Sequence, residues 1–150
     1  MKISMYCLSL DPNHLEKIKY LNYIPVGLGD NNFNKNWLND KLGINISNKN
    51  PFYGEYTFHY WIWKNHLKNL EKGWIGFCQY RKFWTPNEIK KDISLMTDLN
   101  YFTLKKIPEN YLKYDSIIGE PFYVNQFRFT KFLKRNLKKM MLNPKFLLKK

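Results

Sequence analysis

The sequence predicts an α/β fold in which the strands of a sheet alternate with helices, and three observations support this prediction. Short segments rich in strand formers alternate along the chain with segments of helical periodicity. One strand near the middle of the chain is apolar until it ends in the polar run Gln79-Tyr80-Arg81-Lys82. At 150 residues, 44% hydrophobic and 18% aromatic, the chain is long and apolar enough for one packed domain.

The first third of the chain predicts two strands joined by a short helix. Residues 2–10 alternate and are rich in strand formers, and Asp11-Pro12-Asn13 ends this strand. Residues 14–21 have the length of a short helix. Residues 24–30 read as a short extended piece followed by a Gly-rich turn. Residues 31–50 are crowded with Asn, Lys, Asp and Gly, which favours an ordered irregular loop.

A helix followed by a strand is expected next. Asn50 is suited to cap the helix and Pro51 to its first position, with Gly54 close to the boundary. The strand covers residues 74–83. One helical face carries Tyr56, Tyr60, Trp63 and Leu67. The aromatic side chains of Tyr60, Trp61 and Trp63 are expected in the core rather than as platforms for sugars.

The last part of the chain predicts a helix, a strand and a basic tail. The helix covers residues 86–93 and the strand residues 114–119. Residues 126–141 form an amphipathic helix with a basic face. Residues 126–150 hold nine of the 25 Lys and Arg residues and none of the 12 acidic residues, so they dominate the net charge of +13. We therefore expect an α/β domain over residues 1–125 and a basic helical tail over residues 126–150.

The composition narrows the classes of protein to which this chain can belong. The sequence contains no run of about 18 apolar residues, so no membrane span is expected. The N-terminus lacks the cleavage site of a signal peptide. Cys7 and Cys78 lie in predicted strands and are expected to be reduced core thiols. A cytoplasmic protein is expected, with peripheral binding at the inner face of the membrane as an extension of this hypothesis. The sequence has no Cys/His cluster that would indicate a zinc site.

Two motifs carry a resemblance to a known family. Residues 50–65 read NPFYGEYTFHYWIWKN, and residues 74–84 read WIGFCQYRKFW. They resemble the helix N-x-Y-x-E-x-T-x-x-Y-W-x-W-K-N and the strand W-I-G-x-x-H-Y-R-R of a glycosyltransferase-like family of bacterial capsular and exopolysaccharide loci, the domain of unknown function 4422. Gln79 stands where His is usual, and Lys82 where a second Arg is usual. Members of the family continue beyond this length, so the chain resembles their N-terminal portion.

The resemblance implies a GT-A-like (Rossmann-like) sheet, incomplete here, that binds a nucleotide-sugar donor. The sugar would be transferred to a polysaccharide or lipid-linked acceptor. GT-A proteins end the equivalent strand in an Asp-x-Asp metal motif, whereas this chain has Gln79-Tyr80-Arg81 there and no Asp-x-Asp anywhere. The resemblance therefore implies either a metal-independent diphosphate site or a manganese or magnesium ion whose ligands lie outside these residues. A proton-transfer role does not carry over to Gln79, but a neutral hydrogen-bonding role does.

The candidate donor site is the polar end of this strand, because ligands of open α/β sheets bind beyond the carboxyl ends of the strands. The guanidinium of Arg81 matches two phosphate oxygens, and Lys82 and Lys64 add point charges. Gln79 and Arg81 share one strand face, while Tyr80 and Lys82 share the other. All four reach one ligand only if the strand ends near Gln79 and the chain turns, and we favour Arg81 with Gln79.

Other acidic and imidazole side chains are weaker candidates. Glu55 is expected to orient Arg81. The alternatives are a contact with a ribose or sugar hydroxyl and a purely structural ion pair with Arg81. Asp30 follows the turn Gly27-Leu28-Gly29, which lacks the third Gly of a Rossmann fingerprint. Asp115 and Glu120, after a predicted strand, are the candidates for the catalytic base. His59 and His66 are expected to be packed or surface residues.

The basic tail supports a second functional hypothesis. A solvated face is the commonest role of such a helix. It also suits an anionic membrane surface that presents a lipid-linked acceptor. Nucleic acid is a weaker candidate, because no nucleic-acid-binding motif accompanies the basic residues. The alternative to a glycosyltransferase is thus a non-enzymatic basic protein that binds nucleic acid or anionic membrane through residues 126–150.

Overall fold

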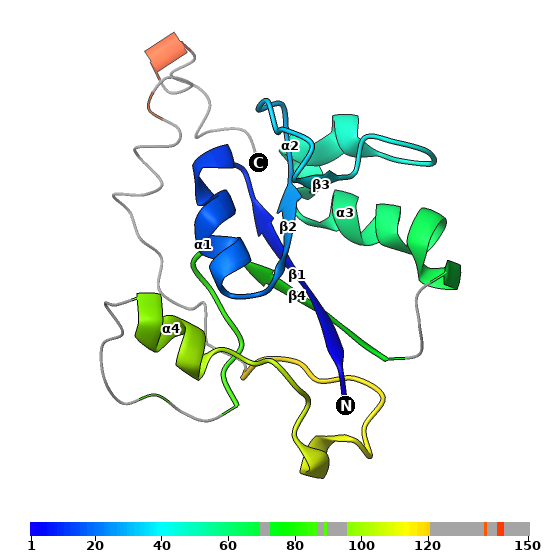
Figure 1. Cartoon of the computed structure of the whole chain (residues 1–150). Helices are drawn as coiled ribbons and strands as arrows, with labels where there is room; N and C mark the ends of the chain where they lie inside the picture. The colour runs from blue at the N-terminus through cyan, green and yellow to red at the C-terminus, as the bar shows by residue number, and fades with distance from the viewer. Residues whose placement is uncertain (70–72, 87–88, 90–95, 121–136, 138–140, 143–150) are drawn as a thin grey trace. The chain divides into compact units, whose positions relative to one another are not determined.

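A four-stranded parallel sheet forms the centre of the fold (Figure 1). Its strands are β1 (Ile3–Ser9), β2 (Ile24–Gly27), β3 (Leu38–Asn39) and β4 (Trp74–Gln79). The order across the sheet is β3-β2-β1-β4, and each neighbouring pair is parallel. This confirms the predicted α/β class with a parallel sheet, as in Rossmann-like folds.

The computed structural model describes residues 1–69, 73–86, 89, 96–120, 137 and 141–142. The chain divides into two units, Met1–Ile117 and Ile118–Lys150, and the sheet belongs to the first. Apart from isolated positions, the helices expected over residues 86–93 and 126–141 lie outside the described residues. None of the helices in the described part is long and apolar enough to cross a membrane.

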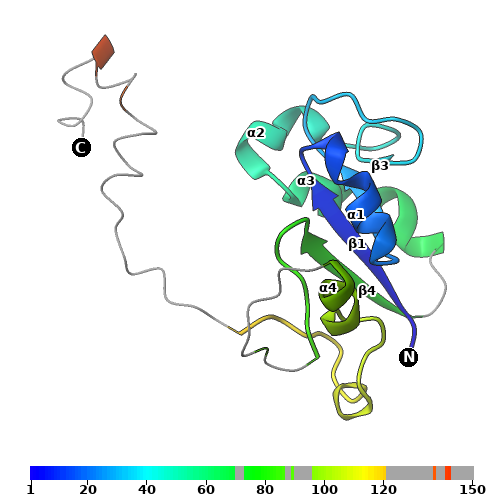
Figure 2. The ribbon, with the colours of Figure 1, turned by 60° about the vertical axis from the view of Figure 1, so that its left-hand side comes forward.

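Helices cover both faces of the sheet, as Figures 1 and 2 show. On one face, α1 (Leu15–Tyr20) buries Leu15 and Ile18 in a cluster that also contains Met5 and Cys7. On the other face lie α2 (Asn50–Tyr53) and α3 (Tyr56–Trp61), the latter continued by the π-helix η3 (Ile62–His66). Their cluster contains Tyr6, Leu8, Val26, Phe58, Trp61 and Ile62. Alternate side chains of β1 therefore enter opposite halves of the core.

The remaining elements are short. The helix α4 (Met96–Phe102) is followed by Leu104, whose carbonyl accepts a hydrogen bond from the Tyr23 hydroxyl at 2.8 Å. This bond ties the segment after α4 to the α1 side of the core, where Leu104 packs. Single 3-10 turns are η1 (Pro12–His14), η2 (Ser47–Lys49), η4 (Leu67–Asn69) and η5 (Glu109–Tyr111).

The strand order creates a topological switch point between β1 and β4. The chain moves outward from β1 to β2 and β3, and then returns to place β4 on the other side of β1. At such a point ligands bind in a crevice beyond the carboxyl ends of the two neighbouring strands. The segments that follow β1 and β4 are therefore the places to look for a binding site.

Three predicted elements differ from the structure. The strand expected over residues 74–83 ends at Gln79, because the chain turns back and Gln79 pairs with Lys82. The strand expected over residues 114–119 is wrong: this segment is irregular and almost entirely exposed, with no strand partner among the described residues. The helix expected from Asn50 is divided at Gly54, whose φ of +55° and ψ of −129° are not helical.

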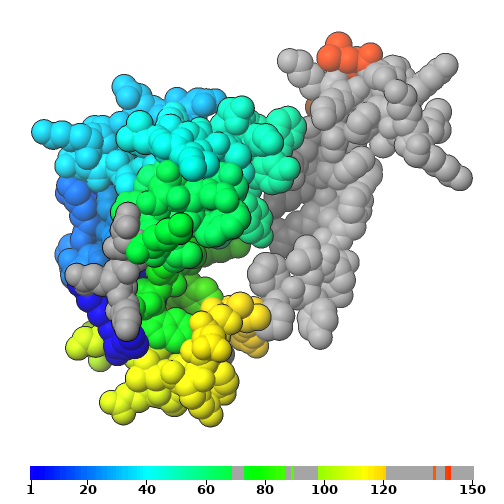
Figure 3. Space-filling model, turned by 90° about the vertical axis from the view of Figure 1, so that its right-hand side faces the viewer, coloured from blue at the N-terminus to red at the C-terminus, as the bar shows by residue number. Residues whose placement is uncertain are grey.

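The aromatic residues of the long helix divide between the core and the surface. Thr57, Phe58, Trp61 and Ile62 face the sheet. Tyr56 and Trp63 are 65% and 56% exposed. Figure 3 shows the face of the molecule on which α3 lies, in green. Both stripes have helical spacing, and the sheet below selects the one that contains the aliphatic Ile62 and the compact Thr57. Of the three aromatic residues expected in the core, Trp61 is buried, Tyr60 is half-buried and Trp63 is exposed.

Candidate functional site at the sheet switch point

The turn after β4 gathers the four polar residues of the strongest sequence motif. Leu8 and Gln79 are paired across β1 and β4, and the Tyr80 amide donates to the Leu8 carbonyl at 3.1 Å. The Gln79 and Lys82 backbones exchange two hydrogen bonds of 3.2 and 3.0 Å. The strand thus ends at Gln79 and the chain turns, which is the condition under which all four side chains can serve one ligand. Arg81 and Lys82 are exposed on this turn.

Glu55 holds Gln79 from the α3 side of the crevice. Its carboxylate accepts a hydrogen bond from the Gln79 side-chain amide. The position of Glu55 depends on the Gly54 carbonyl, which accepts hydrogen bonds from Asn50 Nδ2 at 2.9 Å and from Thr57 Oγ1 at 3.0 Å. The Gln79 side chain is therefore a neutral group held by a hydrogen bond at the end of β4. Within the described part of the chain, Glu55 is bonded to Gln79 and forms no ion pair with Arg81.

A second polar group lies on the α1 side, after β1. The Ser9 side chain is buried, and its Oγ lies 2.8 Å from His14 Nδ1. The Tyr80 ring stacks on the His14 ring with 4.0 Å between centroids and 14° between planes. Asp11 approaches the other imidazole nitrogen, with 3.9 Å between Oδ2 and Nε2. The ends of β1 and β4 are therefore joined by side chains as well as by the sheet.

The loop after β2 completes this edge of the sheet. The Leu28 amide donates to the Ser9 carbonyl at 2.9 Å, and the Asn31 side-chain amide donates to the Leu10 carbonyl. Asp30 is exposed on the turn between them. The structure therefore places Asp30 at the same carboxyl edge of the sheet as Arg81.

The charge at this edge is set mainly by side chains rather than by a metal cage. The guanidinium carbon of Arg81 lies 5.4 Å from the centre of the Tyr80 ring. Among the described residues there is no group of three or more His, Cys, Asp or Glu that could hold a metal ion. In the part of the chain that the structure describes, the carboxylate in hydrogen-bond contact with the end of β4 is that of Glu55, which Gln79 already occupies. The donor set therefore suits an anionic ligand.

The comparisons with known proteins agree with the motifs. A family model described as "Domain of unknown function (DUF4422)" matches residues 5–144. The chain belongs to this family. The match includes every site residue described above, from Ser9 to Lys82. The comparisons with curated proteins and with solved structures found no match.

Two predicted site residues of the first unit, Lys64 and Asp115, are not brought to the switch point. Lys64 lies nine residues after Glu55, about 13 Å further along the helical axis, and its ammonium group lies 3.6 Å from the Trp63 ring centre. Asp115 is exposed after η5, and no hydrogen bond or ion pair within the described residues joins it to the sheet edge. Glu120 belongs to the second unit.

The sequence patterns did not point to Ser9, Asp11 and His14. The signal that could have found them is their position, since Ser9 ends β1 as Gln79 ends β4, and Asp11 and His14 come just after that end. The two other histidines are packing residues. His59 lies over the Phe77 ring at 4.2 Å, and burial lowers its pKa although Glu55 nearby raises it. His66 contacts the Trp61 ring at 5.2 Å.

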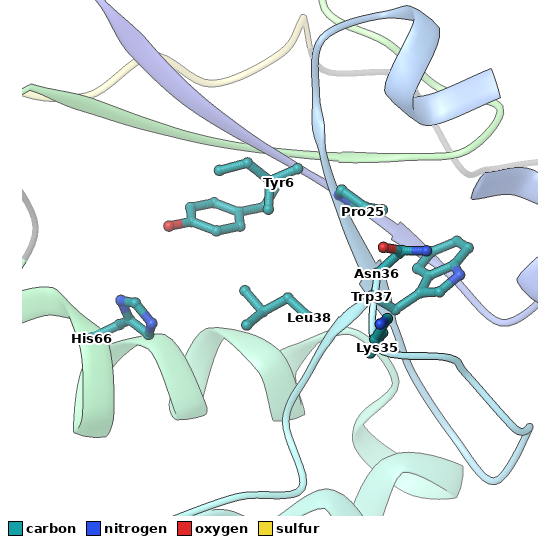
Figure 4. Close-up of a pocket in the computed structure, with 8 residues that line it drawn as sticks. Tyr6, Pro25, Lys35, Asn36, Trp37, Leu38 and His66 are labelled. Atoms are coloured by element: carbon teal, nitrogen blue, oxygen red, sulfur yellow. The ribbon is translucent and has the colours of Figure 1, made fainter. Parts of the chain in front are cut away.

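A separate open hollow of about 350 Å³ lies elsewhere on the DUF4422 domain (Figure 4). Tyr6, Leu38 and His66 surround it, with His66 on the helical side and the other two on the sheet side. Ile24 and Pro25, at the start of β2, also line it, so it lies away from the carboxyl edge of the sheet. Burial raises the pKa of Tyr6 and keeps its hydroxyl neutral. The hollow lacks the cationic turn of the switch point.

Proposed function

We propose that this DUF4422 chain binds a nucleotide-sugar donor beyond the carboxyl ends of β1 and β4. It would be the donor-binding part of a glycosyltransferase that acts on a polysaccharide or lipid-linked acceptor. The single observation that supports this most is the turn Gln79-Tyr80-Arg81-Lys82 at the topological switch point. A cationic turn at this place in an α/β sheet is suited to a diphosphate.

The chemistry of sugar transfer explains why cations are needed there. When the bond between the sugar and the diphosphate breaks, negative charge develops on the leaving phosphate oxygens. Arg81 can donate two parallel hydrogen bonds to these oxygens, and Lys82 adds a second positive charge. Glu55 fixes the Gln79 amide, which leaves that residue as a neutral contact for a sugar or ribose hydroxyl.

A divalent cation bound at the end of β4 does not fit these residues. Glycosyltransferases with an Asp-x-Asp motif present carboxylates at this position, whereas here the chain presents an amide, a phenol and a guanidinium. Hard cations such as Mg²⁺ prefer oxygen ligands, and a guanidinium repels them. We therefore assign the charge compensation to Arg81 and Lys82. Residues 126–150 would hold the protein at an anionic membrane surface.

Thermal unfolding with and without ligands tests the proposal. We expect nucleoside diphosphates and nucleotide sugars to raise the unfolding temperature in the presence of a chelator. Arg81→Ala should weaken binding by about 10- to 100-fold, the scale of hydrogen bonds to a charged group. Lys64→Ala is the matched control, because it removes the same charge from an exposed position at the far end of the helix.

Three results would contradict the proposal. Equal loss of binding in both variants would show a diffuse charge effect, and full binding by Arg81→Ala would show that the ligand lies elsewhere. Stabilisation that requires manganese would show that carboxylates, and not this turn, hold the diphosphate.

A further inference from the structure

We infer that His14 is a further phosphate-binding side chain of the switch-point site, and that it binds as an imidazolium through Nε2. The inference rests on the proposed donor site and adds to it a residue on the opposite side of the crevice from Glu55. His14 follows β1, while Arg81 follows β4, so the two side chains come from the two strands that flank the switch point.

The hydrogen bonds of Ser9 fit a His14 ring with a proton on Nδ1. The Ser9 hydroxyl has one proton, and the Asp11 carbonyl oxygen lies 3.1 Å from Oγ as an acceptor for it. The Asp11 amide donates to Ser9 Oγ at 3.0 Å. With the hydroxyl proton directed to Asp11, Oγ accepts from His14 Nδ1 at 2.8 Å, as an imidazolium requires. The nitrogen left for a ligand is then Nε2.

The surroundings of Nε2 leave it able to bind a ligand. Its neighbour is Asp11 Oδ2 at 3.9 Å, which is beyond hydrogen-bond distance. The His14 side chain is 25% exposed, so the imidazole is neither enclosed nor fully solvated. The Ser9 bond and the Tyr80 stack fix the ring from its edge and from its face. The ring is thus oriented before any ligand arrives, which reduces the entropy lost on binding.

The charges around His14 sum to a positive value when His14 binds as an imidazolium. The Asp11 carboxylate faces it from its own turn, and the Tyr80 ring faces it from the turn after β4. Arg81 is the next residue of that turn, with its guanidinium carbon 5.4 Å from the centre of the Tyr80 ring. Asp11 offsets one of the two cations, so one positive charge is left to attract an anion. The diphosphate of a nucleotide sugar is such an anion, with one negative charge on each phosphate.

Calorimetric titration with UDP-glucose and GDP-mannose at pH 6 and pH 8 tests this inference. Both phosphates of these probes are diesters whose charge is constant over this range, so a change in affinity reports on the protein. Histidine is the side chain whose charge changes in this range. We expect binding about tenfold tighter at pH 6, the scale of one charge-assisted hydrogen bond. We also expect proton uptake on binding, seen as a dependence of the binding heat on the buffer.

Two variants separate this role from a purely structural one. His14→Gln keeps a hydrogen-bonding side chain without charge, and it should bind at both pH values as the native protein does at pH 8, without proton uptake. His14→Lys keeps a constant charge and should bind equally well at both pH values, which also shows that the site is intact.

The outcomes distinguish this inference from the proposed function. If Arg81→Ala loses binding while His14→Gln keeps the native affinity and pH dependence, the donor site stands and the role of His14 is refuted. If the native protein binds with the same affinity at pH 6 and pH 8, the role of His14 is likewise refuted. If the native protein binds neither probe, both proposals are overturned.

Discussion

Asp40 is a carboxylate in an unfavourable environment. The residue directly follows β3 and is 1% exposed. Neither of its carboxylate oxygens has a hydrogen-bond partner in the described part of the chain. A buried charge without a partner costs free energy, because the group loses its hydration and gains nothing in return. The folded protein therefore carries a local destabilisation at the end of β3.

We predict that Asp40→Asn raises the free energy of unfolding by about 1 kcal/mol or more, because the amide has nearly the same shape without the charge. Urea unfolding monitored by circular dichroism measures the change. Asp30→Asn is the control, since Asp30 is exposed and its substitution should change stability by less than about 0.5 kcal/mol. A loss of stability in Asp40→Asn would mean that the carboxylate is bound to a partner in the folded protein.

The corner between α2 and α3 is the element that positions Glu55. Gly54 adopts φ of +55° and ψ of −129°, which side chains with a Cβ rarely adopt. An added Cβ would meet no atom within 4 Å, so space is not the limiting factor. The backbone conformation alone requires glycine there.

Gly54→Ala should therefore lower the free energy of unfolding by about 1–3 kcal/mol, the usual cost of a strained backbone residue. It should also weaken nucleotide binding, because Glu55 and Gln79 lose their alignment. Phe52→Ala, which removes a side chain that is 89% exposed nearby, is the control for both effects. Equal unfolding midpoints for the native protein and Gly54→Ala would show that the corner tolerates a Cβ.

Sequence patterns predicted the secondary-structure elements whose signals lie within the element itself or directly beside it in the sequence. The strand at Ile3–Ser9 and the helix at Leu15–Tyr20 have local signals, namely alternation and the stop at Asp11-Pro12. The short strand β3 has no such signal, because two residues show no periodicity. The outward position of Tyr56 and Trp63 depends on which stripe the sheet covers, which spacing alone does not determine.

The candidate site could likewise be predicted only where its residues are close together in the sequence. The polar end of β4 was visible in the sequence, and it correctly predicted that Gln79 and Arg81 lie at a sheet edge. The contribution of β1 depends on contacts between His14 and Tyr80, which are 66 positions apart in the sequence and meet only in the folded sheet. Lys64 was wrongly grouped with Arg81, because the rise of the helix carries it away from the edge.

At the scale of the whole molecule, buried titratable groups limit the pH range of stability. The hydrogen bond to Cys7 and burial raise the pKa of the Cys78 thiol, and burial raises the pKa of Tyr6 and of Tyr23. The folded state holds these protons more tightly than the unfolded state, so stability falls as pH rises above the ordinary values of 9.0 and 10.0. Burial lowers the pKa of Lys105, which opposes this fall in part.

The loss of stability at low pH follows from His59. Burial lowers the pKa of this imidazole from its ordinary value of 6.5. The unfolded state binds this proton more readily, so stability falls as pH decreases below about 6.5. We predict a maximum of the free energy of unfolding between about pH 6.5 and pH 9, measured by urea titration at pH 5, 7.5 and 10.5. His59→Gln should reduce the loss at pH 5. Unchanged stability from pH 7.5 to 10.5 would contradict the assignment of neutral buried thiol and phenol groups.

The proposed function requires that the ligand binds at the switch point and not in the hollow near His66. Amide chemical shifts of the ¹⁵N-labelled protein, recorded during titration with a nucleotide sugar in chelator, distinguish the two places. We expect the largest shifts in Ser9, His14 and the turn from Gln79 to Lys82, with smaller ones around Asp30. Shifts that cluster instead at Ile24, Trp37 and His66 would contradict it and assign the ligand to the hollow.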